Sequence, residues 1–148
     1  MVFKNETQLK GFILQKCRVA LARTQEQVYK ILDIYMQRFY ADYDPVWYHR
    51  TYQLMKSLVK SDIKPTKNGY EAYVYFDIDG LSYTTGSKPS MEQVVDAAAH
   101  GGHGATGLKV VPAGGEDIWW TPLEILDAEA IEILKSMLIA EGIPIVKG

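Results

Sequence analysis

Cysteine is nearly absent from this sequence, whose 148 residues include only Cys17. A single cysteine forms no intramolecular disulfide, so the composition fits a reducing compartment. The basic neighbours Lys16 and Arg18 point to other faces of a helix and do not activate the thiol. We therefore expect Cys17 to be a small buried apolar side chain, not a nucleophile.

Long apolar runs are also missing. No run approaches the roughly 20 apolar residues that a membrane-spanning helix needs. Residues 1–6 lack the basic segment followed by an apolar one that begins a signal peptide. We expect a protein that is made and initially kept inside a cell, with no membrane as its partner.

An excess of positive charge is absent as well, because 16 Lys and Arg residues face 18 Asp and Glu, for a formal net charge of −2. A dedicated nucleic-acid binder concentrates basic residues on one face, so this charge balance argues against that class of protein. Apolar residues make up 47% of the chain and charged residues 23%, so the chain can bury a core. Its length predicts one domain over residues 1–148.

Catalytic motifs are sparse. No serine lies in a Gly-x-Ser-x-Gly elbow, and the glycine-rich segment 101–107 lacks the Lys-Ser/Thr ending of a phosphate loop. His100 and His103 form an H-x-x-H pair that binds a divalent metal if Asp96 or His49 completes the site. A small metal-dependent enzyme centred on this pair is one alternative. The simpler interpretation is a loop with His100 near a helix C-terminus, so we expect no enzyme, no cofactor and no metal.

A long helix is predicted over residues 6–41, which contain no proline and only one glycine. Its apolar stripe, in steps of three or four with one skip at Thr24, consists of Leu9, Ile13, Cys17, Ala20, Val28, Ile31, Tyr35 and Phe39. The opposite face carries Lys10, Arg18, Gln25, Asp33 and Arg38. A continuous helix of roughly 50 Å exceeds the diameter of a compact domain of this size, about 30 Å. Part of it must project, bend or be covered by another subunit, unless it breaks near residues 22–25 with Thr24 as a cap.

The helix is expected to stop at Asp44-Pro45, because proline disfavours the α region for the residue before it. Aromatic residues then surround Arg50, which we interpret as part of a packed structural corner. These aromatic residues are Tyr43, Trp47, Tyr48 and Tyr52. A short helix is expected over residues 50–60. Its buried edge is either Tyr52, Met55 and Val59 or Leu54 and Leu58.

Residues 70–78 are the clearest strand, because apolar residues alternate along it. Tyr73 and Tyr75 lie on its second face, and tyrosine tolerates a half-wet surface that meets a partner. Asn68-Gly69 and Asp79-Gly80 are turn signals, with residues 81–85 as a returning strand. A small helix over residues 90–100 and short strands at 108–111 and 118–120 would follow. Glycine density predicts a mobile loop region over residues 84–118.

The last helix is predicted to begin with Thr121 as N-cap, Pro122 at the first helical position and Glu124 closing a capping box. Its apolar face is Leu123, Leu126, Ala130, Leu134, Met137 and Leu138. Gly142 is the expected C-cap, Pro144 forbids continuation, and residues 143–146 would add an edge strand. The fold class is α+β: a long N-terminal helix, a short second helix, a small antiparallel sheet with an inserted short helix, and a C-terminal helix.

The segment Tyr43-x-Pro45-x-x-Tyr48-x-Arg50-Thr51-x-x-Leu54-x-x-Ser57 resembles a segment of small structural proteins from tailed bacteriophages and prophages. These are minor capsid, neck, head–tail joining or tail-completion proteins. The loop Gly102-His103-Gly104 after a short helix is also similar to what they carry. They often have Arg-Thr-Gly at the second helix, where this chain has Tyr52 in place of the glycine.

This resemblance implies assembly without catalysis. Such proteins form rings, commonly hexameric, between the capsid portal and the tail tube, and DNA passes through the lumen without specific binding. The implied partners are other copies of the chain and the phage portal, connector and tail proteins. The implied location is the virion, after assembly in the bacterial cytoplasm. A slightly acidic chain suits this role, because a strongly basic lumen would hold the phosphate backbone.

The candidate interface residues are Tyr73, Tyr75, Trp119 and Trp120. Exposed aromatic residues are common at protein interfaces. A cytosolic adaptor that binds a partner helix is a third interpretation of the same features. The sequence does not separate a head-side from a tail-side position.

Overall fold

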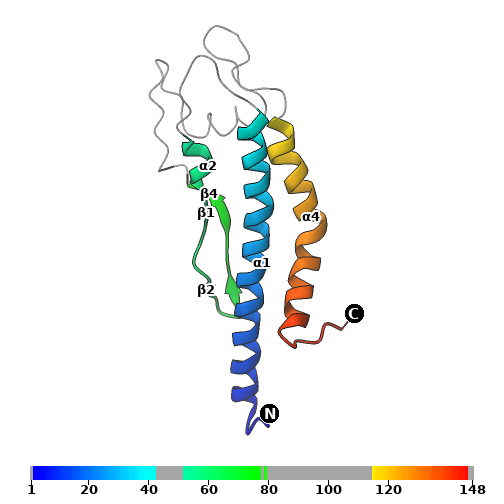
Figure 1. Ribbon diagram of the computed structural model, residues 1–148. Helices are drawn as coiled ribbons and strands as arrows, with labels where there is room; N and C mark the ends of the chain where they lie inside the picture. The colour runs from blue at the N-terminus through cyan, green and yellow to red at the C-terminus, as the bar shows by residue number, and fades with distance from the viewer. Residues whose placement is uncertain (1, 43–51, 78, 80–114, 147–148) are drawn as a thin grey trace.

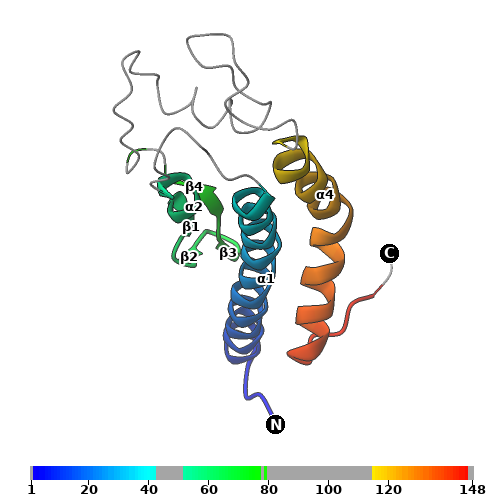
Figure 2. The ribbon, with the colours of Figure 1, turned by 45° about the horizontal axis from the view of Figure 1, so that its top comes forward.

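The computed structural model describes residues 2–42, 52–77, 79 and 115–146. The elements in chain order are α1 (Glu6–Asp42), α2 (Gln53–Ser57), β1 (Leu58–Lys60), β2 (Lys64–Pro65), β3 (Tyr70–Glu71), β4 (Val74–Phe76) and α4 (Gly115–Ala140). In Figure 1, α1 runs through the middle, with α4 antiparallel on one side and the strands on the other; Figure 2 shows the same arrangement. The predicted α+β class is confirmed.

α1 is one continuous helix of 37 residues, about 55 Å long at 1.5 Å per residue. Its last described residue is Asp42, and the predicted stop at Asp44-Pro45 lies outside the described residues. No break occurs near Thr24, whose hydroxyl instead donates a hydrogen bond of 2.9 Å to the carbonyl oxygen of Ala20. The alternative of two shorter helices is therefore wrong, because this hydroxyl bonds within the helix and caps nothing.

The N-terminal turns of α1 extend past the end of α4 and past the strands (Figure 1). Leu9 and Ile13, one helical turn apart on these first turns, are 39% and 38% exposed. Phe3 packs on Phe12 with ring centroids 5.3 Å apart. The apolar stripe of α1 therefore continues beyond what α4 covers.

The strands form one bulged hairpin. β1 pairs antiparallel with β4, from Leu58↔Phe76 to Lys60↔Val74, and β2 pairs antiparallel with β3, from Lys64↔Glu71 to Pro65↔Tyr70. Between the two ladders, residues 61–63 face residues 72–73, so one strand carries an extra residue, which is a β-bulge. The predicted strand over residues 70–78 is interrupted at this bulge. Thr66 N–H bonds the Gly69 carbonyl at 2.9 Å and closes the turn.

The core lies where the hairpin and α2 meet the C-terminal half of α1. Met36, Leu54 and Leu58 are buried there, with six partly buried neighbours: Tyr29, Leu32, Tyr40, Met55, Val74 and Phe76. The Leu54–Leu58 edge predicted for the second helix is thus the buried one. The helix itself ends at Ser57, so the prediction of a helix to residue 60 is wrong. Residues 58–60 pair with β4 because this ladder satisfies their backbone groups.

α4 begins six residues earlier than predicted, at Gly115. Thr121 is therefore not an N-cap, and Pro122 lies inside the helix. The predicted strand at residues 118–120 is wrong, because these residues are helical. Residues 115–118 likewise belong to α4 and not to the predicted loop region. In the sequence, Trp119 continues the helical spacing of Leu123 and Leu126 upstream of the proline, and this longer helical pattern contradicts the local start signal at Thr121-Pro122.

The C-terminus of α4 ends as predicted. Gly142 has φ of 82°, the left-handed region that glycine adopts without a Cβ clash. Its N–H bonds the carbonyl of Ile139, and Ile143 N–H bonds the carbonyl of Leu138, both at 2.9 Å. These two bonds form a Schellman motif that satisfies carbonyls at the helix end. Residues 143–146 form no strand with the described part of the chain, so the predicted edge strand is not found.

Candidate functional site

Many of the predicted site residues lie outside the described residues. These are Tyr43, Pro45, Tyr48, Arg50 and Thr51 of the corner, Gly102, His103 and Gly104 of the loop, and His100 and His103 of the alternative metal pair. Residues 81–85, 90–100 and 108–111 lie outside them too. Leu54 of the corner motif is 4% exposed and belongs to the core. Trp119 and Trp120 lie in α4.

Tyr73 and Tyr75 lie on the hairpin face that points away from α1. Their neighbours Val74 and Phe76 pack into the core, and alternate residues of a strand point to opposite faces. Tyr73 is 55% exposed and Tyr75 is 49% exposed. Val59 pairs with Tyr75 across the ladder and is half-buried on the same face. The structure thus places both predicted interface tyrosines on one open surface.

The Tyr73 hydroxyl donates a hydrogen bond of 3.1 Å to a carboxylate oxygen of Glu71. This bond stabilises the protonated phenol, and with the negative charge of Glu71 it raises the pKa of Tyr73 above 10.0. The phenol is therefore neutral near neutral pH and is held along the strand. Its ring offers a flat apolar surface with a polar tip, which is typical of interface tyrosines.

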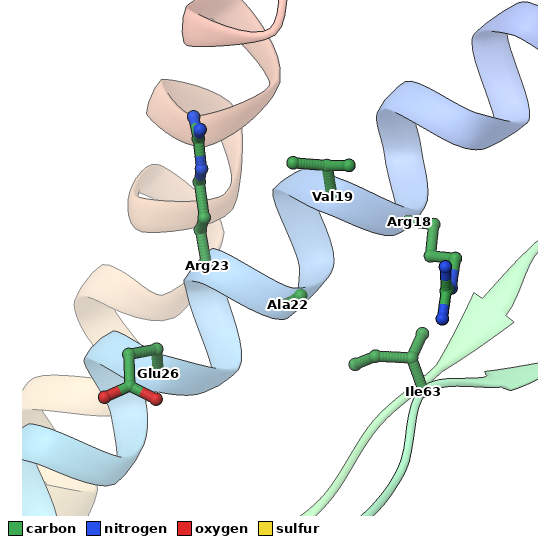
Figure 3. Close-up of a pocket in the computed structure, with 6 residues that line it drawn as sticks. All are labelled: Arg18, Val19, Ala22, Arg23, Glu26 and Ile63. Atoms are coloured by element: carbon green, nitrogen blue, oxygen red, sulfur yellow. The ribbon is translucent and has the colours of Figure 1, made fainter.

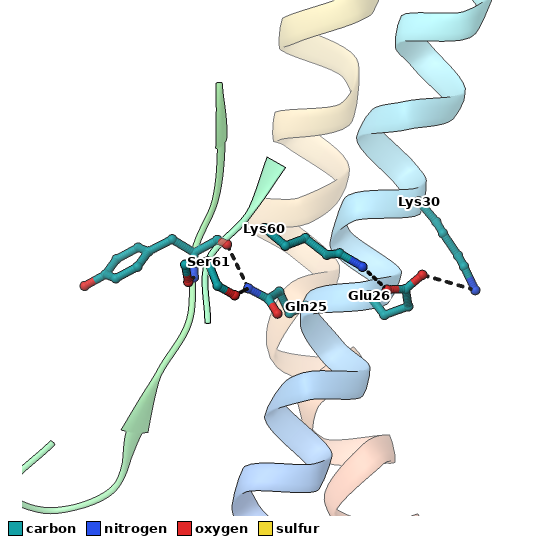
Figure 4. Close-up of polar contacts among 6 residues, drawn as sticks. Gln25, Glu26, Lys30, Lys60 and Ser61 are labelled. Carbon is teal, nitrogen blue, oxygen red and sulfur yellow. Dashed lines mark hydrogen bonds and ion pairs between the residues drawn. The ribbon is translucent and has the colours of Figure 1, made fainter. Parts of the chain in front are cut away.

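Gln25 on α1 holds the hairpin at its bulge. Its side-chain amide nitrogen donates to the carbonyl oxygen of Ser61 at 2.9 Å and to that of Tyr73 at 2.8 Å. Ser61 N–H bonds the Tyr73 carbonyl at 2.9 Å, and Tyr73 N–H bonds the Ser61 hydroxyl at 2.9 Å. Figure 4 shows Gln25 reaching from the helix to the strand. Because the bulge frees the Ser61 carbonyl from the ladder, a helix side chain can bind it.

An ionic cluster lies one residue further along α1. Lys60 of β1 forms a short charge-assisted hydrogen bond to Glu26, and Lys30 lies 3.8 Å from the same carboxylate (Figure 4). The hydrogen bond from Lys60, followed by the charges of Lys60 and Lys30, lowers the pKa of Glu26. The Lys60 ammonium also lies 4.9 Å from the ring centre of Tyr29.

A second ionic cluster joins the end of α4 to α1. Glu141 accepts from Lys16 at 3.0 Å and from Arg23 at 2.6 Å, and its side chain is 9% exposed. The hydrogen bond from Lys16, aided by the charges of Arg23 and Lys16, lowers the pKa of Glu141. Ala20 lies between these cations in sequence and is fully buried. These ion pairs therefore hold the C-terminal end of α4 against α1.

A groove of about 370 Å³ lies on α1 between the hairpin and α4, lined by Arg18, Val19, Ala22, Arg23, Glu26 and Ile63. In Figure 3, Ile63 of the hairpin and Arg18 lie at one side and Arg23 lies at the other, towards α4. Val19 and Ala22 form its apolar floor. The surface of this groove is mainly apolar, with charged groups of Arg18, Arg23 and Glu26 around it.

Sequence reasoning placed Gln25 and Arg18 on a solvent face and missed the second packed side of α1. The signal was a second apolar stripe, Tyr29, Leu32, Met36 and Tyr40, at helical spacing in the C-terminal half of α1. Cys17, expected to be buried, is half-buried. Within the described residues there is no group of three or more His, Cys, Asp and Glu side chains placed to hold a metal ion. No helix in the described ranges is both long and apolar enough to cross a membrane.

A protein-family model named YomN matches residues 5–117. This range covers more than half of the chain, from α1 through the hairpin to the first residues of α4, so the chain belongs to the YomN family. The family is named after a gene of a Bacillus phage or prophage, and the protein is thus phage- or prophage-associated. Neither the curated proteins nor the solved structures compared with the chain gave a match.

Proposed function

We propose, with membership of the YomN family as the premise, that this protein is a non-enzymatic virion assembly protein at the head–tail junction. It acts as a connector or tail-completion protein, forms a ring of several copies, and docks to portal and tail proteins. DNA passes through the lumen of the ring without specific binding. The protein is assembled in the bacterial cytoplasm and remains in the virion.

The observation that carries this proposal is the projecting helix α1, whose first turns carry apolar side chains that the described part of the chain leaves uncovered. Leu9 and Ile13 are both more than one third exposed on turns that extend past α4 (Figure 1). A helix with an uncovered apolar stripe is stabilised by burying it against another element. In a ring, that element belongs to the neighbouring subunit.

Two further features support the proposal. The described part of the chain has only four buried apolar residues, Ala20, Met36, Leu54 and Leu58. Meanwhile Tyr73 and Tyr75 hold an aromatic surface open to solvent on the hairpin. Aromatic side chains are enriched at protein interfaces, so this face suits the docking of a portal or tail protein.

Deletion of the gene from the phage or prophage that carries it tests the proposal. The expected result is filled heads and separate tails in electron micrographs of the lysate, with joined virions restored by the gene supplied in trans. Mass spectrometry of purified wild-type virions is expected to find the protein. Normal virion yield without the gene, or virions that lack the protein, would overturn the proposal.

A further inference from the structure

We propose that the groove of α1 binds the acidic outer face of α4 from a second copy of the chain. The inference rests on the proposed function and deepens it, since it names the two surfaces that meet in the ring. The groove is the one lined by Arg18, Val19, Ala22, Arg23, Glu26 and Ile63. The acidic face is the exposed side of α4 that carries Glu124, Asp127, Ile131, Glu132 and Ile139.

The groove has a positive rim because Arg18 is unpaired within the described ranges and Arg23 stays exposed although it shares Glu141 with Lys16. Arg18 is exposed and makes no ion pair or hydrogen bond within the described ranges. Arg23 remains 55% exposed although it pairs with Glu141. The surrounding charged groups are five cations, Lys16, Arg18, Arg23, Lys30 and Lys60, against two carboxylates, Glu26 and Glu141. Each carboxylate is already shared between two cations, so the groove keeps a positive excess.

The outer face of α4 has the opposite charge. This face exposes three carboxylates, Glu124, Asp127 and Glu132, and the basic residue beside them, Lys135, pairs with Glu132 at 2.6 Å. Ile131 and Ile139 are 64% and 60% exposed on the same side. Eight residues separate them, or about 12 Å along the helix. Acidic groups thus flank apolar side chains that nothing in the described chain covers.

The two surfaces complement each other in charge and in apolar character. Carboxylates of α4 would pair with Arg18 and Arg23, while an isoleucine covers the floor of Val19 and Ala22. A copy cannot fill its own groove this way, because these α4 side chains are exposed and do not pack on its own α1. The contact joins two different surfaces, so it is heterologous. A heterologous contact builds a ring when the rotation between neighbouring copies brings the last copy back to the first.

Charge-reversed variants test the pairing. Arg18→Glu alters the groove alone, and Glu124→Lys with Asp127→Lys alters the α4 face alone. Each change sits on an exposed side chain, and circular dichroism verifies that the helices remain. Sedimentation velocity over a concentration series is expected to show association weakened about tenfold or more in either variant. Lys67→Glu makes the same charge change on an exposed residue of the hairpin turn, outside the groove, and is expected to associate like the wild type.

Mixing the two variants gives the sharpest result. The intact groove of one then binds the intact α4 face of the other, and the two reversed surfaces also carry opposite charges, so association is expected to recover towards the wild-type level. Association of the wild type is also expected to weaken as salt rises. If all the charge reversals leave the wild-type multimer unchanged, this inference is overturned, while the proposed ring still stands. The groove would then bind an acidic segment of another protein, or the subunits would meet through a different contact. A wild type that stays monomeric at every concentration would overturn both.

Discussion

The Gln25 side chain on α1 donates a hydrogen bond of 2.8 Å to the main-chain carbonyl of Tyr73 on the hairpin. The same amide nitrogen bonds the carbonyl of Ser61 at 2.9 Å, on the opposite strand. One helix side chain thus fixes both strands at the bulge. Because Tyr73 is held by its backbone on the α1 side, its ring faces outward and remains available to a partner.

Replacing Gln25 by leucine is expected to lower the free energy of unfolding by about 1–3 kcal/mol, since the Ser61 carbonyl loses its donor and the Tyr73 carbonyl keeps only the Ser61 N–H. Urea unfolding measures the loss. Gln27→Leu is the matched control, because Gln27 is exposed on the same helix, and it is expected to change stability by less than about 0.5 kcal/mol. Equal losses in the two variants would contradict the role given to Gln25.

Tyr52 lies in the left-handed region of the backbone, with φ of 55° and ψ of 18°. Its ring packs on Tyr40 with centroids 5.1 Å apart. Ala and Gly both remove this ring, so their difference isolates the backbone. Tyr52→Gly is expected to be more stable than Tyr52→Ala by roughly 1 kcal/mol, as measured by thermal or urea unfolding.

Gly11 is the control for this backbone effect, because the order of glycine and alanine in stability is expected to be reversed there. It lies inside α1, and a Cβ added there would meet nothing within 4 Å. Gly11→Ala is therefore expected to stabilise the protein by about 0.5–1 kcal/mol, because alanine favours the helix. If alanine is better than glycine at position 52 as well, Tyr52 does not carry a left-handed backbone in solution.

The Glu141 cluster predicts acid sensitivity. The hydrogen bond from Lys16, with the charge of Arg23, lowers the pKa of Glu141 below 4.5 in the folded state. In the pH range between that lowered pKa and about 4.5, the unfolded chain binds more protons than the folded chain. Stability from this carboxylate is therefore present above pH 4.5 and is lost as the pH falls below it. Thermal unfolding followed from neutral pH to pH 3 measures the loss.

Two variants identify the source of this acid sensitivity. Glu141→Gln removes the titrating group, and Lys16→Met removes its principal hydrogen-bond donor, so both are expected to flatten the curve below pH 4.5. Part of the acid sensitivity is expected to remain in both, since Lys60 lowers the pKa of Glu26 as well. An unchanged curve in Glu141→Gln would show that the cluster does not form in solution.

The extent of α1 and its projection are predictable from the sequence, because thirty-odd residues of helical periodicity without proline leave few other structures. The C-cap at Gly142 is predictable too, since glycine suits the left-handed residue that ends a helix. These features depend on local preferences. The phage association also followed from a short motif, which the family match supports independently.

The predictions that were wrong share one physical cause: tertiary contacts override local sequence preferences. Thr121-Pro122 has the composition of a helix start, yet α4 continues through it. Residues 58–60 have helical spacing with Leu54, yet they pair with β4 because the ladder satisfies their backbone groups. The contacts of Gln25 with Ser61 and Tyr73 span 36 and 48 residues, and no local pattern announces them.

Tyr75 tests whether the open hairpin face serves assembly. Tyr75→Ser is expected to change the free energy of unfolding by less than about 1 kcal/mol, because the side chain is 49% exposed. It is expected to weaken binding to a portal or tail protein, as measured by co-sedimentation. Phe76→Ser, which alters the adjacent core residue, is expected to do the reverse and destabilise the fold. Unaltered docking of the Tyr75→Ser variant would remove this face from the interface.

The central claim is that the chain assembles with itself, and light scattering across a concentration series tests it most directly. The account predicts a defined multimer whose mass is several times 16.7 kDa, near that of six copies, and whose population grows with concentration. A single mass of 16.7 kDa at every concentration would contradict it.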